Sequence, residues 1–185
     1  MKKIYLLLAI AFMVCTLACS SNQSKANFTK GLEKQFTSQE LDLLNEVALN
    51  FEEQLKELYN SNDVNPLYRR FVGELENLSI STTFYTNSKS KDILLRLQEF
   101  PSLNEKLQNT YLMAAAENAS SEEFASLLEA TYNAGDIPPD LAASGLNTFT
   151  DQQLYQDDVK LFAAIYLYYS WISYVQQSGS LPAEL

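Results

Sequence analysis

The stretch LFAAIYLYYSWISYV, residues 161–175, carries no charged side chain and shapes our expectation of the whole architecture. A helix that is apolar on every side is buried on every side. With 15 residues the stretch is shorter than the roughly 20 that a helix needs to cross a bilayer. We therefore predict that it belongs to a long helix over residues 150–177 and that this helix forms the centre of a bundle.

The chain before this stretch has the apolar periodicity and the start signals of surface helices. Thr37 with Glu40 and Thr150 with Gln153 form two capping boxes, and Ser102 with Glu105 and Ser120 with Glu123 form two more. The predicted helices cover residues 41–60, 65–78, 90–99, 102–118, 120–135 and 150–177.

This pattern predicts one all-α domain over residues 36–185, a bundle of about six helices packed around the long, apolar, Tyr-rich C-terminal helix. Gly135 is in the position where helices commonly end. Residues 137–147 contain Pro138-Pro139 and are interpreted as a turn with room for one helical turn. Residues 79–88 are either a loop or one short strand.

Composition excludes several chemistries. The 185 residues include 13 Lys and Arg, 23 Asp and Glu and no histidine, which gives a formal charge of −10. Without histidine there is no Ser-His-Asp triad, no histidine-ligated haem and no HExxH zinc site. The acidic balance argues against a nucleic-acid partner, whose phosphates require a basic face. We expect no cofactor and no metal.

The first residues have the layout of a secretory signal peptide. Lys2 and Lys3 precede the uncharged, mostly apolar run 4–18, which ends Ala18-Cys19 before the polar stretch 20–24. Here the chain resembles a bacterial lipoprotein precursor, in which a small residue precedes a cysteine that is acylated and becomes the new N-terminus. Thr16 and Leu17 depart from that family's usual Leu and small residue.

This resemblance implies that residues 1–18 are removed and that Cys19 carries the lipid; Cys15, after bulky residues, is the weaker candidate. Residues 19–35 are then a flexible tether with few apolar anchors. Ser20 suggests the outer membrane, facing the periplasm. The mature chain would have 167 residues and, after loss of both N-terminal lysines, a formal charge of −12. Its membrane contact is the lipid anchor.

The aromatic residues of the C-terminal helix allow two interpretations. In the first, they belong to a core helix whose tyrosine tips reach the surface or bond locally. In the second, they line a groove for an apolar ligand, a glycan or a partner's helix. The residues concerned are Tyr166, Tyr168, Tyr169 and Trp171. They are the candidate ligand or partner contacts.

Acidic side chains offer only weak catalytic candidates. Adjacent pairs occur at Glu52-Glu53, Glu122-Glu123 and Asp157-Asp158, and neighbours on a helix point about 100° apart, which favours a solvated face. The string ATYNAG, residues 130–135, resembles a motif of lytic transglycosylases, and that resemblance makes Glu117 the nearest candidate acid. The upstream strings of that family are missing.

We therefore expect a non-catalytic protein-binding module held at the cell envelope, of inhibitor or immunity type in its sharpest form. Small size, acidity and the lack of catalytic motifs favour this hypothesis. One alternative is a small-ligand carrier that uses an aromatic-lined groove. The other is a peptidoglycan-active lytic enzyme that uses Glu117.

Overall fold

A computed structural model describes residues 26–81, 84, 88–135, 137–170 and 172 of the chain. All regular elements in these ranges are helical, which confirms the all-α class. The elements are α2 (Ser38–Tyr59), α3 (Val64–Glu76), α5 (Ser88–Gln98), α6 (Pro101–Asn109), α7 (Tyr111–Glu117), α8 (Glu122–Ala134), α9 (Pro139–Asn147), α10 (Asp151–Leu154), α11 (Asp157–Phe162) and the π-helix η1 (Ala163–Tyr169). Within these ranges no helix combines the length and apolar character that crossing a bilayer requires.

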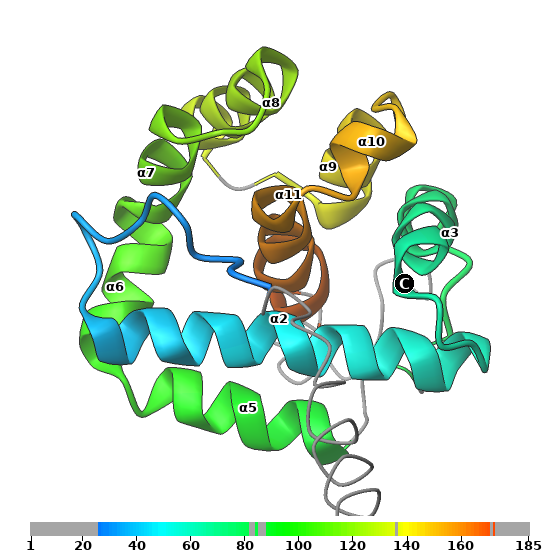
Figure 1. The fold of residues 1–185 in the computed structure, drawn as a ribbon, viewed down its shortest axis with the longest axis horizontal. Coiled ribbons are helices and arrows are strands. Elements are labelled where there is room, and N and C mark those ends of the chain that lie inside the picture. The colour runs from blue at the N-terminus through cyan, green and yellow to red at the C-terminus, as the bar shows by residue number, and fades with distance from the viewer. Residues whose placement is uncertain (1–25, 82–83, 85–87, 136, 171, 173–185) are drawn as a thin grey trace, which may run out of the picture.

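The helices surround α11 and η1 (Figure 1). α2 and α5 lie side by side, α6 and α7 lead from the end of α5 to α8, and α3 packs along α9. α2 begins as predicted, because the Thr37 hydroxyl accepts the N–H of Glu40 and the Glu40 carboxylate accepts the N–H of Thr37. The same reciprocal box joins Thr150 and Gln153 at the start of α10.

The prediction of one continuous helix over residues 150–177 was wrong in its first half. α10 ends after one turn, and Gln156 has an extended backbone (φ −68°, ψ 144°) that starts α11 as a separate helix. Asp157 and Asp158 fill the first turn of α11, where their negative charge is favourable. From Ala163 the α-helix widens into η1. Residues 173–177 lie outside the described part.

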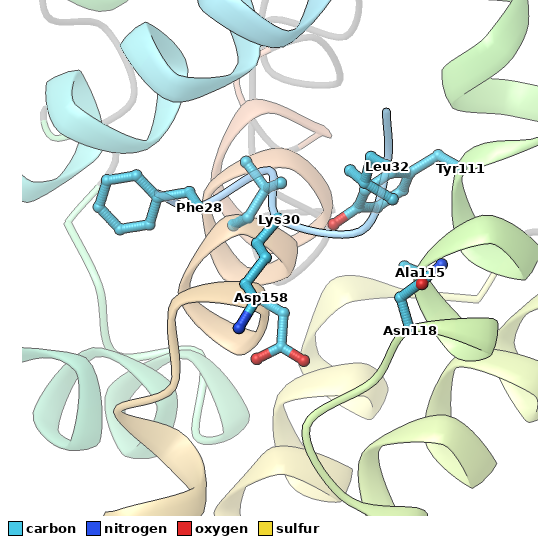
Figure 2. A pocket seen from close by; sticks show the side chains of 8 residues that line it. Phe28, Lys30, Leu32, Tyr111, Ala115, Asn118 and Asp158 are labelled. Carbon is cyan, nitrogen blue, oxygen red and sulfur yellow. The ribbon is translucent and has the colours of Figure 1, made fainter. Parts of the chain in front are cut away.

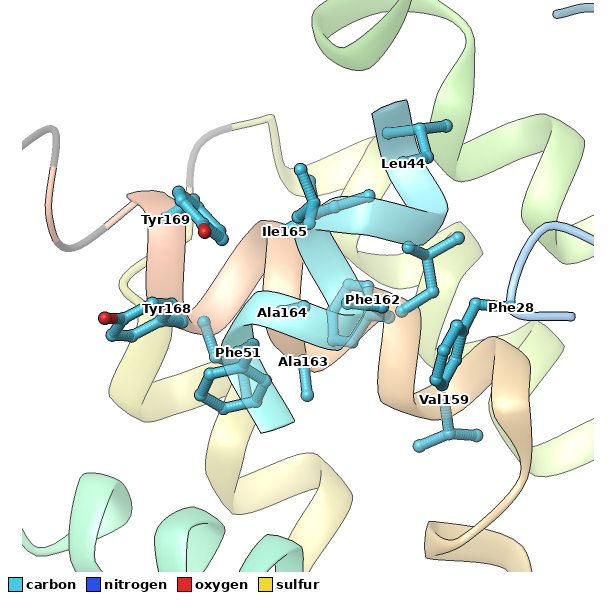
Figure 3. Close-up of a cluster of buried hydrophobic side chains, with 14 of the residues drawn as sticks. Phe28, Leu44, Phe51, Val159, Phe162, Ala163, Ala164, Ile165, Tyr168 and Tyr169 are labelled. Atoms are coloured by element: carbon cyan, nitrogen blue, oxygen red, sulfur yellow. The ribbon is translucent and has the colours of Figure 1, made fainter. Parts of the chain in front are cut away.

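The central segment is nevertheless buried, as its lack of charge predicted. All side chains from Leu161 to Tyr169 except Tyr166 are at most 9% exposed, and the charged Lys160 just before them is buried as well and pairs with Glu52. Figure 3 shows this cluster, in which Phe51 of α2 stacks on Tyr168 with ring centroids 4.8 Å apart. Phe124 of α8 meets Phe162 edge-on at 5.8 Å. Aromatic contacts therefore join α2, α8 and the central segment into one core.

Two other predicted elements were corrected. The single helix over 102–118 is divided at Thr110 into α6 and α7, and Ser102 is not a cap, because its hydroxyl donates to Glu40 at 2.9 Å. The segment 137–147, predicted as a turn with one helical turn, instead contains the nine-residue helix α9, with Pro139 at its first position, where a missing N–H costs nothing.

The remaining boundaries agree more closely with prediction. α8 is capped by Ser121 instead of Ser120, and it ends at Gly135 as expected. α3 begins one residue before the predicted cap Asn65, with Asp63 in the cap position. Among residues 79–88, those that the structure describes include no strand.

The segment before α2 packs against the helices. Phe28 and Leu32 are 1% and 3% exposed and belong to the core, and Phe36 is buried beside them. The Asn45 side chain accepts the N–H of Phe28 at 3.0 Å and donates to the hydroxyl of Thr29 at 2.9 Å. Residues 26–35, assigned above to the tether, are thus a packed part of the domain in this structure; residues 19–25 lie outside the described part.

Candidate functional site

The structure places the tyrosines proposed as ligand contacts in the core. Tyr168 and Tyr169 are 0% and 4% exposed, and the Tyr169 hydroxyl donates to Asn50 at 2.8 Å. Tyr166 is partly buried and stacks on Phe162, with centroids 5.2 Å apart. This arrangement matches the first of the two interpretations, that of a core helix whose tyrosines bond locally. Trp171 and Cys19 lie outside the described residues.

The candidate acid Glu117 is exposed at the last position of α7. The string that suggested it, residues 130–135, forms the end of α8. Of the carboxylate pairs, Glu122-Glu123 is solvated as predicted. Glu52, in contrast, is largely buried and faces Lys160 at 3.5 Å. Burial raises the pKa of Glu52, and the charge of Lys160 partly offsets that effect.

A cleft of about 250 Å³, lined by polar side chains and by Phe28, lies where the N-terminal segment crosses between the end of α7 and the start of α11. Its lining comes from three places in the sequence: the N-terminal segment, the link between α7 and α8, and the first turn of α11. The lining residues include Asn27, Lys30, Gly31, Asn118, Ser120, Asp157 and Asp158. We call this feature the α11 cleft.

The two aspartates hold the walls of the α11 cleft together. The Asp158 carboxylate accepts the N–H of Ser120 at 2.7 Å and that of Val159 at 3.0 Å. The Asp157 carboxylate accepts the N–H of Asn27 at 3.3 Å. Both side chains are partly buried, so this pair departs from the solvated face that the sequence predicted. Each carboxylate retains unused acceptor positions, since it can accept about four hydrogen bonds.

Close approach of two backbones shapes one side of the cleft. Gly31 has φ +92°, a left-handed conformation that favours glycine. A Cβ atom there would stand 2.7 Å from the Cβ of Asn118. The Asn118 side chain is itself held, because its amide donates to the carbonyl oxygen of Ala114 at 2.8 Å. Glycine at position 31 therefore lets the N-terminal segment lie directly on the end of α7.

Tyr111 lines a second, narrow pocket beside the cleft (Figure 2). This pocket has a volume of about 10 Å³, room for about one water molecule, and Lys30 and Asp158 also line it. The Tyr111 side chain is 1% exposed. Burial, with a smaller contribution from the charge of Asp158, raises the pKa of Tyr111, so the hydroxyl stays protonated.

The surroundings of the cleft are acidic. Residues 107–159 contain nine Asp and Glu and no Lys or Arg. Four of these acids, Glu117, Glu122, Glu123 and Glu129, are exposed on α7 and α8. Across the described residues none of the four forms an ion pair, whereas Asp151 pairs with Arg69 at 3.0 Å. We call these four glutamates the α7–α8 acidic face.

Sequence reasoning found only part of this site. Asp157-Asp158 was recognised as a pair next to an apolar helix, but Tyr111 and Lys30 were not identified as site residues. No local sequence pattern distinguishes these two residues. Tyr111 fits the apolar face of a predicted helix, and Lys30 looks like any other residue of the predicted tether. Over the ranges that the structure covers, no group of three or more acidic or sulfur side chains could hold a metal ion.

Comparisons with known proteins complete these observations. No family model, curated protein or solved structure matches this chain.

Proposed function

We propose that this protein is an envelope lipoprotein, anchored by lipid on Cys19, that acts as a non-catalytic protein-binding module for a partner with a basic surface. The proposed location is the outer membrane, facing the periplasm. An inhibitor or immunity role toward a toxin or hydrolase is the sharpest form of this function.

The α7–α8 acidic face is the observation that carries the proposal. Its glutamates are exposed and lack cationic partners within the described structure. Like charges gathered without counter-charges repel one another, and a basic partner removes that repulsion on binding. Complementary charge also accelerates association and disfavours acidic competitors. Some exposed acids elsewhere have a cationic neighbour, as Glu53 has in Lys56 at 2.5 Å and Asp151 in Arg69 at 3.0 Å.

The anchor would raise the local concentration of the module at the membrane. Bacterial lipoproteins, which the N-terminus resembles, carry two or three acyl chains, and two chains suffice for stable anchoring. Cys19→Ser should move the protein from the membrane fraction to the soluble fraction, while Cys15→Ser leaves it in the membrane. Equal release of both variants would contradict attachment at Cys19.

Affinity capture tests the binding function. The full chain with its lipid is immobilised and exposed to detergent-solubilised envelope, and retained proteins are identified by mass spectrometry. We expect one stoichiometric protein with a basic surface, released as salt rises from 0.05 to 0.5 M because the contacts are charge-dependent. Retention of no stoichiometric protein at low salt would contradict the function.

A further inference from the structure

The N-terminal segment, which leads to the proposed anchor, joins the domain beside the outer side of α2. The Asn45 side chain of α2 accepts the N–H of Phe28 at 3.0 Å and donates to the hydroxyl of Thr29 at 2.9 Å. Leu49 follows Asn45 by four positions, so the two side chains are neighbours on one side of the helix. The side of α2 that carries Leu49 is therefore next to the docked segment.

The distance from the anchor to this point is short. Asn27, whose N–H donates to Asp157, follows Cys19 by eight positions, and a chain of that length spans at most about 29 Å. The 22 residues of α2 alone extend over about 33 Å. A lipid on Cys19 would thus hold Asn27 within one length of α2 from the bilayer, and the surface next to Asn27 is the best placed to touch it.

Two exposed leucines lie on the outer sides of α2 and α5. Leu49 is 45% exposed, and Leu95 of α5 is 56% exposed. Each comes two residues before a buried side chain, Phe51 or Leu97, and two residues are about 200° around a helix. Both leucines therefore point away from the core. α2 and α5 lie side by side along the lower side of the domain in Figure 1. We call Leu49, Leu95 and the surface between them the α2–α5 face.

Charge around Leu49 is balanced. From residue 45 to residue 53, every acidic side chain of α2 has a cationic partner. The pairs are Glu46–Arg96, which joins α2 to α5, Glu52–Lys160 at 3.5 Å and Glu53–Lys56 at 2.5 Å. An apolar surface without net charge suits lipid headgroups. The first turn of α11, on the other side of the docked segment, carries Asp157 and Asp158, whose charge an anionic lipid surface repels.

We propose that the α2–α5 face rests on the bilayer that the lipid anchor enters, with Leu49 and Leu95 in the headgroup region. This proposal rests on the proposed anchor at Cys19 and adds the orientation of the domain. Figure 1 shows α8 at the end of the domain away from α5. This orientation therefore leaves the α7–α8 acidic face directed away from the lipid, where a protein partner can reach it.

Nitroxide quenching on vesicles tests the orientation. The full chain with its lipid is reconstituted on phosphatidylcholine vesicles that contain a nitroxide-headgroup lipid. Because Cys19 carries the lipid and Cys15 is removed with the signal peptide, an introduced cysteine is the only free thiol for a fluorescent label. Leu49→Cys and Leu95→Cys are the test variants. Leu141→Cys, at an exposed leucine of α9, is the matched control.

We expect the nitroxide lipid to quench the labels at positions 49 and 95 at least about twofold more strongly than the label at position 141, because only the first two lie in the headgroup region. Equal quenching at the three positions, or strongest quenching at position 141, would overturn the proposal.

A second set of variants tests the leucines themselves. A label on Asp42→Cys, at an exposed position of α2, reports on contact with the lipid. Leu49→Ser combined with Leu95→Ser should lower its quenching about twofold, because burial of apolar side chains in the interface favours contact. Leu141→Ser should leave the quenching unchanged, and circular dichroism checks that each variant keeps its fold. An equal effect of the two substitutions would contradict the proposed role of the leucines.

The outcomes separate the orientation from the anchor. A chain that does not float with the vesicles would contradict lipid attachment, and the orientation falls with it. A floating chain whose label at position 49 is not quenched contradicts the orientation alone and leaves the anchor standing. Shielding of that label in detergent without vesicles, increasing with protein concentration, would assign the α2–α5 face to a second copy of the chain and would also overturn the proposal.

Discussion

The backbone N–H of Phe28 donates a 3.0 Å hydrogen bond to the side-chain oxygen of Asn45, on the helix that follows in the sequence. This bond aligns the N-terminal segment with α2 and places Phe28 in the core. The same segment provides Lys30 and Gly31 to the α11 cleft. The cleft therefore exists only while the segment stays docked.

Removal of the Phe28 ring should destabilise the domain strongly. Phe28→Ala should lower the free energy of unfolding by about 3–5 kcal/mol, because a fully buried phenylalanine leaves a cavity. Urea unfolding followed by circular dichroism measures the change, and Lys34→Ala, an exposed position on the same segment, is the control. A free tether would show no difference between the two variants.

Two glycines should respond to alanine in opposite directions. Gly31→Ala should lower stability by about 1–3 kcal/mol, because φ is +92° and the new Cβ atom would meet Asn118 at 2.7 Å. Gly73, inside α3, has nothing within 4 Å of an added Cβ atom. Gly73→Ala should raise stability by about 0.5–1 kcal/mol through helix propensity. Melting temperatures compare the two; a shift of the same sign in both would contradict the geometry at Gly31.

Glu40 should make stability depend on pH in the acid range. Burial alone would raise the pKa of Glu40, but hydrogen bonds from Lys106, the Thr37 backbone and Ser102 outweigh it and lower the pKa to about 2. The unfolded chain has an ordinary glutamate pKa near 4.3. The folded pKa is thus the lower one, so the stabilisation is complete above pH 4.5 and is lost as the pH falls toward 2.

Glu40→Gln tests this linkage. The difference in the free energy of unfolding between wild type and variant should be on the order of 2–3 kcal/mol at pH 7 and much smaller at pH 2. Glu105→Gln, an exposed glutamate of α6, serves as the control. A difference that stays constant between the two pH values would show that the charge of Glu40 contributes nothing.

Two buried tyrosines should differ when their hydroxyl groups are removed. The Tyr68 hydroxyl is fully buried and makes no well-aligned hydrogen bond with a described residue; burial, followed by the charge of the nearby Glu52 carboxylate, raises the pKa of Tyr68. Tyr68→Phe should therefore leave stability unchanged or raise it by up to about 1 kcal/mol. Tyr169→Phe should cost about 1 kcal/mol, because Tyr169 donates to Asn50 at 2.8 Å. Chemical unfolding of both variants measures the change in stability. A larger loss of stability in Tyr68→Phe than in Tyr169→Phe would contradict this interpretation.

Local signals in the sequence predicted the helical class and several helix starts. The boxes at Thr37 and Thr150 were found because all their contacts lie within four residues. The break before Asp157 was missed because it depends on distant partners, the N–H groups of Asn27 and Ser120. Ser102 was misassigned for the same reason, since its actual partner Glu40 lies 62 positions away.

The candidate site was less predictable than the fold. Its walls come from three separate segments, which are brought together by packing of Phe28 and Leu32 in the core and by the hydrogen bonds that Asp157 and Asp158 accept. A sequence pattern predicts which face of a helix is apolar, but it does not predict which other helix that face packs against. Tyr111 belongs to the core and also lines the small pocket beside the cleft, a combination that no local spacing encodes.

The most direct test of the central claim, that an acidic surface binds a basic partner, is the partner capture repeated with two charge variants. Glu117→Gln, Glu122→Gln and Glu129→Gln are combined in the first variant. The second, of equal net charge, combines Asp42→Asn, Glu99→Gln and Glu105→Gln at exposed positions on α2, α6 and the link between α5 and α6. We predict that the first variant loses about tenfold or more of the captured protein and that the second retains it. Equal retention by both variants would contradict binding through the α7–α8 acidic face.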